Sequence, residues 1–475
     1  MKTFYWYDYE TFGLSPRVQR IAQFAGIRTD ENLNVIDEHM FYCKPTHDSL
    51  PSPEACAVTG ITPQLCEKKG LIEHEFIKKI HAEFSKSETC IVGYNSIAFD
   101  DEYTRHTLFR NFIDPYSWHW QNGNARWDIL NVARFCYAHK EKGSLNWVIN
   151  EKNRPIFKLD NLAPANNIEH ANAHDAMADV RATIGIAKII KDTQPKFFDY
   201  ALSLNDKKEV GKLVKPLHPM LLTSSSFGYK SSFTRLVTAI CNHPEYNDRA
   251  IVFNLNQDPE IFLELEAEEL KALTFSKKSD LPKGIEKLDL SELVYNKSPM
   301  FVCSPNSDSF KISPILIDKF QLNLEKCLKN LRFIQQNRQS IEDKVRAIYN
   351  IDSDREQSRD VDQSLYDGFM SNNDRAICNE IQNLSPTQLV DYLPAFEDRK
   401  LVKLFLNFKA RNYPQLLNEF EQEQWFEIVQ ARIQSGENGF LSIDSFERSL
   451  ESLRESHPGR ENLWKELEDY AQSFI

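Results

Sequence analysis

The sequence predicts an α/β domain at residues 1–192, a small β domain at 195–350 and an α-helical domain at 353–475. Three observations support this prediction. Short strand-like runs alternate with amphipathic helices in the first part, β-like runs separated by turn residues fill the second, and helical spacing returns in the third. The length of 475 residues also exceeds what a single hydrophobic core usually serves.

The α/β prediction rests on short apolar or aromatic runs bounded by Gly, Pro and Asp. We expect strands at Phe4–Tyr7, Gln23–Arg28, Val35–Cys43 and Cys90–Tyr94. We expect helices at Asp101–Phe112, Asp128–Tyr137 and Asp175–Lys191. The last of these helices runs into the sequence DTQPK, whose proline should end it.

The second and third parts of the chain differ in texture. Phe233–Cys241 and Ala250–Leu255 have the composition of strands. The stretch NIDSDREQSRDVDQ, which starts at Asn350, is polar and free of aromatic residues, so we interpret it as a linker. Beyond it the apolar residues follow the i, i+3, i+4, i+7 spacing of a helix. These residues are Leu401, Leu404, Phe405 and Phe408.

The composition excludes an extensively disordered protein, because 41% of the residues are apolar and 12% are aromatic. The opening sequence MKTFYWYDYE lacks the features of a secretion signal, and no apolar run reaches the 18 residues that a membrane span requires. We therefore expect a soluble cytoplasmic protein. Nine cysteines without a CxxC pair indicate reduced core thiols and not a zinc site or a disulfide framework.

The formal net charge of −12 argues, by itself, against a nucleic acid as partner, because phosphates are bound by clustered Lys and Arg. Net charge is a sum over the whole chain, however. An acidic protein can still line one groove with basic residues, and acids that bind metal become part of a cationic centre once the metal is loaded.

Asp8 and Glu10 form the first acidic pair with a spacing that suits a metal site. Residues two apart on a strand point to the same face, so both carboxylates would project from the end of the first strand into one site. A solvated strand edge explains the same pair, and the pair taken alone favours that alternative.

Asp100 follows the apolar run Cys90–Tyr94 and opens the next expected helix. Asp100 or Asp101 could simply be the N-cap, which accepts backbone N–H bonds and needs no metal. Two adjacent aspartates allow both functions. We expect Asp100 to face the site while Asp101 caps the helix or pairs with a cation.

His174 and Asp179 lie five positions apart at the start of the helix expected at Asp175–Lys191. Positions five apart in a regular helix differ by about 140°, so the two side chains share a site only if His174 lies at or before the first turn. Asn172 and the helix-start signals place it there. A lone histidine is usually a packed or solvated residue, but the neighbouring acids favour a functional one.

Asp8, Glu10, Asp100 and Asp179 would repel one another strongly if they met, so a structural core would not assemble them without cations. Hard divalent metal ions with oxygen ligands meet this need. Two Mg²⁺ ions can clamp a phosphodiester, activating water and stabilising the leaving 3′-oxygen, and Mn²⁺ is an alternative. His174 would then be the general base, since its unperturbed pKa of about 6.5 suits proton removal near neutrality.

Three segments, FYWYDYETFG, GYNSIAFDDEYTR and HANAHDAMADV, resemble the three motifs of the histidine-containing branch of the DEDD exonuclease superfamily. Within this superfamily the chain resembles the bacterial exonuclease I family, because AQFAGIRTD, FYCKP, VTGITP, NFIDPYSW and RWDIL also recur in the expected order. LYDGFMSNNDRA and LFLNFKARNYP extend the resemblance to the C-terminal part.

The resemblance implies an RNase H-like exonuclease domain, an SH3-like domain and a helical C-terminal domain. It implies 3′→5′ hydrolysis of single-stranded DNA to mononucleotides in DNA repair and recombination, made processive by the two later domains. It assigns the four acids Asp8, Glu10, Asp100 and Asp179 as metal ligands and His174 as the base.

The resemblance also implies a set of DNA contacts. Cations would bind phosphates and flat rings would stack on bases, whereas the alternatives are a solvated helix face for the cations and core burial for Trp120. Ile61 would be an apolar wedge beside the last base, although a core position explains it equally. The expected DNA-binding residues are Glu10, Ile61, Arg105, Tyr116, Trp120, Arg134 and Lys158.

The family partner implied by the resemblance is the acidic C-terminal tail of single-stranded DNA-binding protein, in a basic apolar pocket that includes Lys140 and Tyr200. Lys140 and Lys158 stand where the family pattern admits arginine, which weakens bidentate phosphate contact and keeps the charge. We expect a monomer.

Two competing functions are a related exonuclease that acts on RNA and a non-catalytic scaffold that binds single strands. About 280 residues follow the exonuclease motifs, which disfavours the shorter enzymes of the superfamily. The complete set of acids disfavours a scaffold, because a binder gains nothing from carboxylates placed against phosphates. The five chemical residues do not distinguish deoxyribose from ribose.

Overall fold

The computed structural model of the chain describes residues 3–140, 142–170, 175–282, 284–303, 311–350 and 357–474. The chain forms two compact units. The first comprises residues 1–125, 170–184 and 355–475, and the second comprises 126–169 and 185–354. Two of the boundaries between them fall within β5 (Ala125–Asp128) and α7 (Ala176–Thr193).

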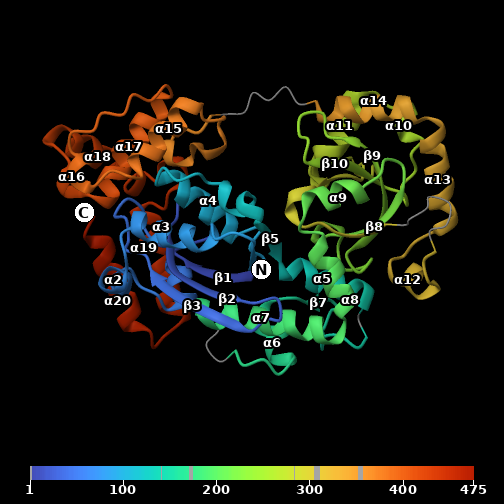
Figure 1. The fold of residues 1–475 in the computed structure, drawn as a ribbon, viewed down its shortest axis with the longest axis horizontal. Helices are drawn as coiled ribbons and strands as arrows, with labels where there is room; N and C mark the ends of the chain where they lie inside the picture. The colour runs from blue at the N-terminus through green and yellow to red at the C-terminus, as the bar shows by residue number, and fades with distance from the viewer. Residues whose placement is uncertain are drawn as a thin grey trace. The chain divides into compact units, whose positions relative to one another are not determined.

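The first unit is built on a sheet with the strand order β3-β2-β1-β4 (Figure 1). These strands are β1 (Thr3–Thr11), β2 (Ile21–Thr29), β3 (Val35–Tyr42) and β4 (Thr89–Gly93). β1 pairs antiparallel with β2 and parallel with β4, while β2 pairs antiparallel with β3. β1 is therefore an interior strand whose backbone is held from both sides.

The helices of the first unit come from both ends of the chain. They are α1 (Pro53–Thr59), α2 (Pro63–Lys69), α3 (Glu73–Phe84), α4 (Asp100–Arg110), α15 (Asn372–Ile381), α16 (Pro386–Leu389), α17 (Arg399–Asn412), α18 (Glu419–Ile433), α19 (Ile443–Ser456) and α20 (Glu461–Gln472). One apolar cluster joins α1 and α2 to α19 and α20, and a second joins the end of α4 to α15 and α17. The predicted C-terminal helices thus pack directly on the N-terminal sheet and helices.

The residues of β1 alternate between two environments, as strand geometry requires. Its tyrosines pack into an aromatic core with α3 and α4. Asp8 and Glu10 occupy the alternate positions and point to the opposite face of the sheet. The strand extends to Thr11 and not only to Tyr7, and both acids lie on it and share one face, as predicted.

The second unit contains an antiparallel sheet with the order β11-β10-β9-β8-β12. Its strands are β8 (Pro219–Thr223), β9 (Thr234–Asn242), β10 (Arg249–Asn254), β11 (Leu290–Val294) and β12 (Met300–Cys303), with the short pair β6 (Val148–Ile149) and β7 (Pro155–Ile156) apart from them. β9 and β10 confirm the two predicted strands. One apolar core joins this sheet to α13 and α14.

The second unit has helices before, between and after these strands in the sequence. They are α5 (Ile129–Lys140), α6 (Leu159–Ala165), α8 (Pro195–Ser203), α9 (Lys207–Leu213), α10 (Ile261–Glu264), α11 (Ala267–Phe275), α12 (Pro314–Lys319), α13 (Leu324–Gln336) and α14 (Arg338–Tyr349). Pro195 begins α8 directly after α7 ends at Thr193, which confirms the predicted stop. The predicted fold class, an α/β part followed by a β-rich part and a helical part, is confirmed.

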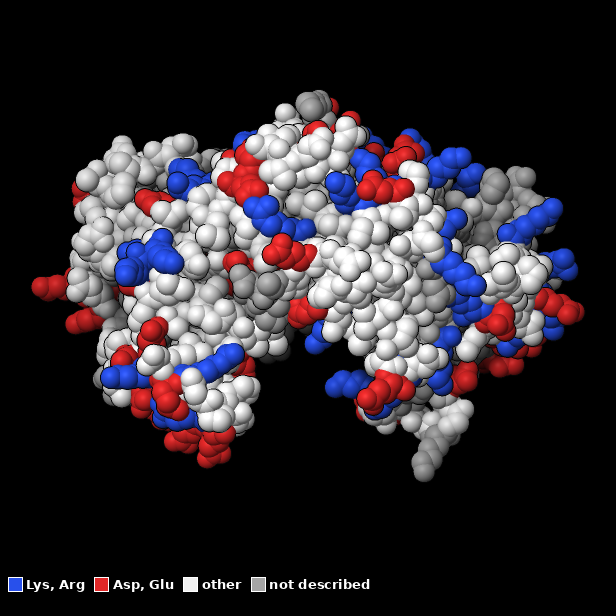
Figure 2. Space-filling view, turned by 90° about the horizontal axis from the view of Figure 1, so that it is seen from below, with Lys and Arg blue, Asp and Glu red and all other residues white. Residues whose placement is uncertain are grey.

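The burial of the cysteines and the distribution of surface charges agree with what the composition led us to expect. All nine cysteines are free, and seven of them are buried, as predicted for core thiols. On the face shown in Figure 2, lysine and arginine side chains lie among the aspartates and glutamates, so the net negative charge does not form a uniform acidic surface there. Within the described residues, none of the helices has the length and apolarity to span a bilayer.

A buried arginine–aspartate network joins the N-terminal and C-terminal segments of the first unit. We use this name for Arg20, Asp48, Asp362, Arg411 and Arg432, whose side chains are at most 2% exposed. Asp362 Oδ2 lies 2.6 Å from Arg411 Nη1 and 2.8 Å from Arg432 Nη2. Asp48 Oδ2 lies 2.8 Å from Arg20 Nη2 and 2.6 Å from Arg432 Nη1. Each carboxylate is therefore shared by arginines from distant parts of the sequence.

The network corrects one sequence expectation. Asp360 and Asp362 belong to the stretch interpreted as a linker, yet Asp362 is fully buried and Asp360 contacts Arg432 at 2.9 Å. The polar composition of this stretch reflects partners supplied by the rest of the fold, which a local window cannot detect. Residues 351–356 of the stretch lie outside the described residues.

Replacing Asp362 by asparagine should destabilise the first unit strongly, because Arg411 and Arg432 would keep their charges in a buried site. Breaking a buried pair in this way costs about 3–5 kcal/mol. Urea unfolding at neutral pH measures the free energy of unfolding. Lys44→Gln is the matched control, since Lys44 and Glu67 form an exposed pair at 3.1 Å whose loss should cost below about 1 kcal/mol. Equal effects of the two substitutions would contradict the role of the network.

The network should also make stability depend on acid pH. Burial opposes ionisation of Asp48, but Arg20, Arg411 and Arg432 outweigh it and lower the pKa of Asp48 to about 2. A folded-state pKa below the unfolded value of about 3.9 means that the stabilisation is complete above about pH 4 and disappears as the pH falls toward 2. The stability difference between the natural chain and Asp48→Asn should therefore shrink across this window. Urea titrations from pH 2.5 to 7 test this, and a constant difference would contradict it.

Candidate active site

Asp8 and Glu10 form the floor of the candidate site. In the register of β1 with β2, Asp8 is opposite Ala25 and Glu10 is opposite Gln23, and the pairing shifts between Glu10 and Thr11. Glu10 is 7% exposed and Asp8 is partly exposed. The alternative of a solvated strand edge is wrong, because β1 is an interior strand and Glu10 is buried.

Asp179 brings a third carboxylate to this face of the sheet. It lies in the first turn of α7, where its backbone N–H donates to the carbonyl of Asp175 at 3.1 Å. Carboxylate oxygens of Asp8, Glu10 and Asp179 lie within 4.8 Å of one another. Two residues of a strand and one of a distant helix therefore present oxygens at a spacing that one cation could bridge.

Asp100 approaches the same group from the start of α4. It is 4% exposed. Burial raises the pKa of Asp8 well above its usual range, and the charges of Asp100, Asp179, Glu10 and Asp175 raise it further, with Asp100 first among them. The structure thus brings the four predicted acids into electrostatic contact. Their mutual repulsion is what a bound cation would relieve.

Asp101 has a different environment from its neighbour. It accepts a hydrogen bond from the hydroxyl of Tyr7 at 2.6 Å, and Phe99, not an aspartate, occupies the N-cap position of α4. The expectation that Asp101 caps the helix is therefore wrong. Its charge does act on a cation, because burial lowers the pKa of Arg105 but Asp101 and Glu102 raise it above its usual range.

His174, the predicted base, lies outside the described residues. A second histidine, His170, does lie at the site. Its Nε2 is 2.5 Å from Asp179 Oδ1, and its side chain is 1% exposed. His170 was not among the residues predicted from the sequence, although it stands in the same motif, four residues before His174.

Arg105, Tyr116 and Trp120 lie on the first unit. Arg105 is buried, donates to Glu102 Oε1 at 2.6 Å and lies 5.6 Å from the centre of the Tyr116 ring. The alternative of a solvated helix face is therefore wrong for Arg105. Trp120 is 59% exposed, so its alternative of core burial is also wrong. Both aromatic rings are accessible, as stacking on bases would require.

Tyr366 contacts the Arg105–Glu102 ion pair, which the sequence did not indicate. Its hydroxyl donates to Glu102 Oε2 at 2.6 Å, so the C-terminal segment helps to hold the carboxylate that pairs with Arg105. Ile61, by contrast, is buried in the apolar cluster of α1, α2, α19 and α20. Its role as a wedge stays a prediction.

The remaining predicted contacts lie in the second unit. Arg134 donates to Asn131 Oδ1 at 3.1 Å and lies 5.8 Å from the centre of the Phe157 ring. Lys158 is exposed at the N-cap of α6. Lys140 is exposed at the end of α5, while the hydroxyl of Tyr200 donates to the carbonyl of Phe301 at 2.8 Å.

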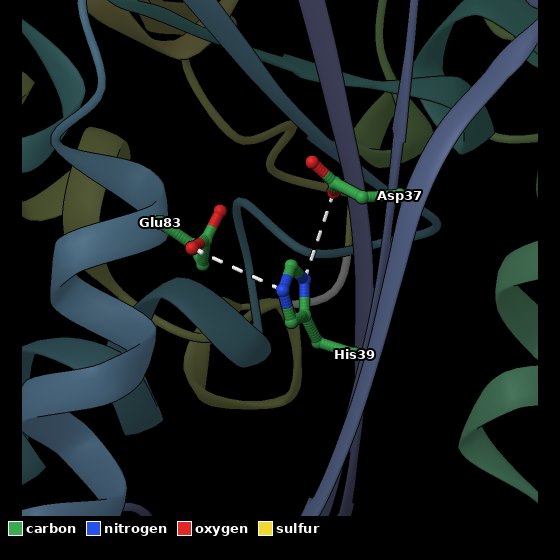
Figure 3. A group of neighbouring side chains, drawn as sticks. All are labelled: Asp37, His39 and Glu83. Atoms are coloured by element: carbon green, nitrogen blue, oxygen red, sulfur yellow. Dashed lines mark ion pairs between the residues drawn. The ribbon is translucent and has the colours of Figure 1, made fainter.

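A second group of metal-type ligands contrasts with the carboxylates around Asp8. Figure 3 shows His39 between Asp37 and Glu83, with its ring nitrogens 3.7 Å and 4.0 Å from their oxygens. Arg28 reaches both acids, at 3.0 Å from Glu83 Oε2 and 3.7 Å from Asp37 Oδ2. Because a guanidinium already balances these charges, the group is an ion-pair network and needs no metal.

Comparison with known proteins assigns the family. The model described as "Exonuclease" matches residues 5–187, "Exonuclease I SH3-like domain" matches 205–351 and "Exonuclease I C-terminal domain" matches 359–474. Exodeoxyribonuclease I of Haemophilus influenzae is 40% identical over 459 residues, which cover 96% of this chain and 94% of that relative. This chain belongs to the exonuclease I family. The Escherichia coli exodeoxyribonuclease I is 41% identical over 429 residues, which cover 90% of this chain and 88% of that relative.

Solved structures of exonuclease I share the whole architecture. Escherichia coli exonuclease I in complex with a dA16 oligonucleotide superposes with a TM-score of 0.93 at 37% identity, with both chains covered completely. The zinc-bound form of the Escherichia coli enzyme with single-stranded DNA gives 0.91 at 38%, covering 100% of this chain and 99% of its own. A structure of SSB/exonuclease I with an inhibitor gives 0.89 at 36%, with complete coverage of both chains. The predicted family and three-part plan are confirmed.

The carboxylates around Asp8 should bind divalent cations in the absence of DNA. A cation that binds only the folded chain stabilises it by about 1.4 kcal/mol at ten times its dissociation constant. Mg²⁺ should therefore raise the melting temperature, and Asp179→Asn should remove this rise. Without metal, Asp8→Asn should be at least as stable as the natural chain, because it removes one of the repelling charges.

The control for this experiment is Asp37→Asn in the ion-pair network of Figure 3, which should leave the Mg²⁺-dependent rise intact. Thermal unfolding with and without chelator measures both effects. A rise that survives Asp179→Asn but is lost in Asp37→Asn would place the metal at the other group.

Proposed function

We propose that the chain is a divalent-metal-dependent exonuclease that degrades single-stranded DNA from its 3′ end to 5′-mononucleotides. The observation that carries the proposal is the convergence of Asp8, Glu10, Asp100 and Asp179 in a member of the exonuclease I family. The proposal assigns residues 1–192 to catalysis and places the SH3-like domain at 195–350 and the helical domain at 353–475.

Asp8, Glu10, Asp100 and Asp179 would hold the metal. The donor set fits Mg²⁺, because a hard cation takes carboxylate oxygens, and the zinc form of the Escherichia coli enzyme supports a divalent ion in general. When bound, a pair of such ions supplies Lewis-acid stabilisation to the attacking water and to the leaving 3′-oxygen. His174 accepts the proton of the attacking water in this proposal, and His170 holds Asp179 through their 2.5 Å contact.

The DNA strand is bound by phosphate contacts and base stacking. Arg105, Arg134 and Lys158 provide cations for phosphates, while the exposed rings of Tyr116 and Trp120 provide stacking surfaces. Glu10 and Ile61 contact the 3′-terminal nucleotide. The buried pairing of Arg105 with Glu102 orients its guanidinium before DNA binds, which lowers the entropy cost of the contact.

The tail of single-stranded DNA-binding protein is the proposed protein partner. A related exonuclease I has been solved with SSB, and this chain carries the exposed cation Lys140 and the aromatic Tyr200 in the second unit. An acidic peptide would bind such a site through its carboxylates and its apolar side chains. The enzyme acts as a monomer in this proposal.

Product analysis on matched oligonucleotides tests the function. Single-stranded DNA, duplex DNA and RNA of one sequence are labelled at the 5′ end and incubated with Mg²⁺ or with chelator. We expect stepwise shortening of the single-stranded DNA alone, abolished by chelator, and a loss of turnover in Asp179→Asn with its fold preserved. Equal degradation of RNA would contradict the proposed specificity for DNA. Absence of any hydrolysis would favour a non-catalytic scaffold.

A further inference from the structure

Gln23 occupies a position of strong constraint beside the carboxylates. It lies on β2 directly opposite Glu10 on β1, so the two side chains share the face of the sheet that carries Asp8. Gln23 is 2% exposed. A buried primary amide is costly unless its N–H and C=O groups find partners, so its hydrogen bonds reveal what the residue does.

The amide of Gln23 binds the start of α7. Its Nε2 donates to Asp175 Oδ1 at 3.3 Å and to the hydroxyl of Tyr42 at 3.1 Å, with Met40 Sδ at 3.5 Å. Its Oε1 accepts the backbone N–H of Ala176 at 3.3 Å. One side chain on a strand thus holds both the side chain and the backbone of the residues that open a helix.

This contact supplies one of the partners that the start of a helix needs. The first N–H groups of a helix have no partner within it, and at α7 a strand side chain accepts the N–H of Ala176. Asp175 in turn accepts the N–H of Asp179 through its own carbonyl at 3.1 Å. A chain of hydrogen bonds therefore runs from the residue opposite Glu10 to the residue that carries the third carboxylate.

We propose that Gln23 is a positioning residue that fixes the distance between the Asp179 carboxylate and those of Asp8 and Glu10. The proposal rests on the metal-ligand role given to these acids above. Their repulsion pushes α7 away from the sheet until cations bind, and the Gln23 contact opposes that motion. The metal then binds an arrangement already held in place, which raises its affinity.

Other side chains would fail here for specific reasons. Leucine fills a similar volume but leaves the N–H of Ala176 and the carboxylate of Asp175 without this partner. Glutamate accepts from Ala176 but cannot donate to Asp175, and it adds a fifth carboxylate to the group. Asparagine is shorter by one methylene and does not reach α7 with the same geometry.

The first test compares Gln23→Leu with Thr29→Val. Thr29 lies on the same strand and accepts a buried hydrogen bond from Trp6 Nε1 at 2.9 Å, far from α7. Both substitutions remove a buried side-chain hydrogen bond made by a residue of β2, so both lower the melting temperature. Only Gln23→Leu should lower kcat and raise the half-saturating Mg²⁺ concentration, each by about tenfold to a hundredfold as for other residues that orient metal ligands.

The changes in kcat, KM and the half-saturating Mg²⁺ concentration show whether Gln23 positions the metal ligands or only stabilises the fold. We expect KM for a single-stranded oligonucleotide to change less than about twofold in Gln23→Leu, because Gln23 is not itself a proposed DNA contact and the cations and rings proposed to bind the strand keep their partners. An unchanged metal requirement, or equal effects of Gln23→Leu and Thr29→Val on kcat, would overturn the proposal.

The second test exchanges the partners and needs no cavity. Gln23→Glu should lose activity through repulsion with Asp175. Adding Asp175→Asn restores a donor opposite the new acceptor at unchanged total charge, so the double variant should recover at least half of the lost kcat on a logarithmic scale. Absence of recovery would overturn the proposal. Asp179→Asn in the same series separates failure of the proposed metal site from failure of the proposed role of Gln23. If Asp179→Asn kept its activity, the metal site itself would be refuted and not only the role of Gln23.

Discussion

The register between β1 and β2 decides which side chains reach the candidate site. Because strand residues alternate, a slip of one residue would turn the tyrosines of β1 out of the aromatic core and bury Asp8 and Glu10 against α3 and α4. The core of large rings makes such a slip very costly. The same register places Gln23 opposite Glu10, so the aromatic packing on one face fixes both the carboxylates and their link to α7 on the other.

The first unit buries carboxylates in two ways that have opposite consequences. In the arginine–aspartate network, Asp48 and Asp362 are neutralised by fixed guanidinium groups, which lower their pKa values and make the pairing permanent. Around Asp8 the neighbours are acids, and the pKa of Asp8 is raised. The first arrangement stabilises the fold, while the second leaves an excess of negative charge that a bound cation would balance.

The sequence predicted which acids come together better than it predicted the residues that support them. Asp8, Glu10, Asp100 and Asp179 follow local rules, since each sits at a strand position or helix start that a short window reveals. Gln23 and Tyr366 act through partners far away in sequence, and nothing in their own neighbourhoods marks them. The polar stretch containing Asp360 and Asp362 was misinterpreted for the same reason, because its arginine partners come from α17, α18 and the N-terminal segment. Burial of Arg105 likewise depends on tertiary contacts and not on its helical spacing.

The arrangement of the site gives a physical reason for building it from distant segments. Acids that repel one another cannot be brought together by a short local motif, since a flexible segment would simply move apart. Here the repulsion acts between an interior strand, a helix start that follows β4 and a helix start tied to β2. Each acid is held by elements that pack for other reasons, so the cost of their proximity is carried by the aromatic core and by the hydrogen bonds of Gln23. In the proposed function a divalent cation would then bind a site whose geometry the fold has largely set in advance, and the carboxylate oxygens would suit a hard ion.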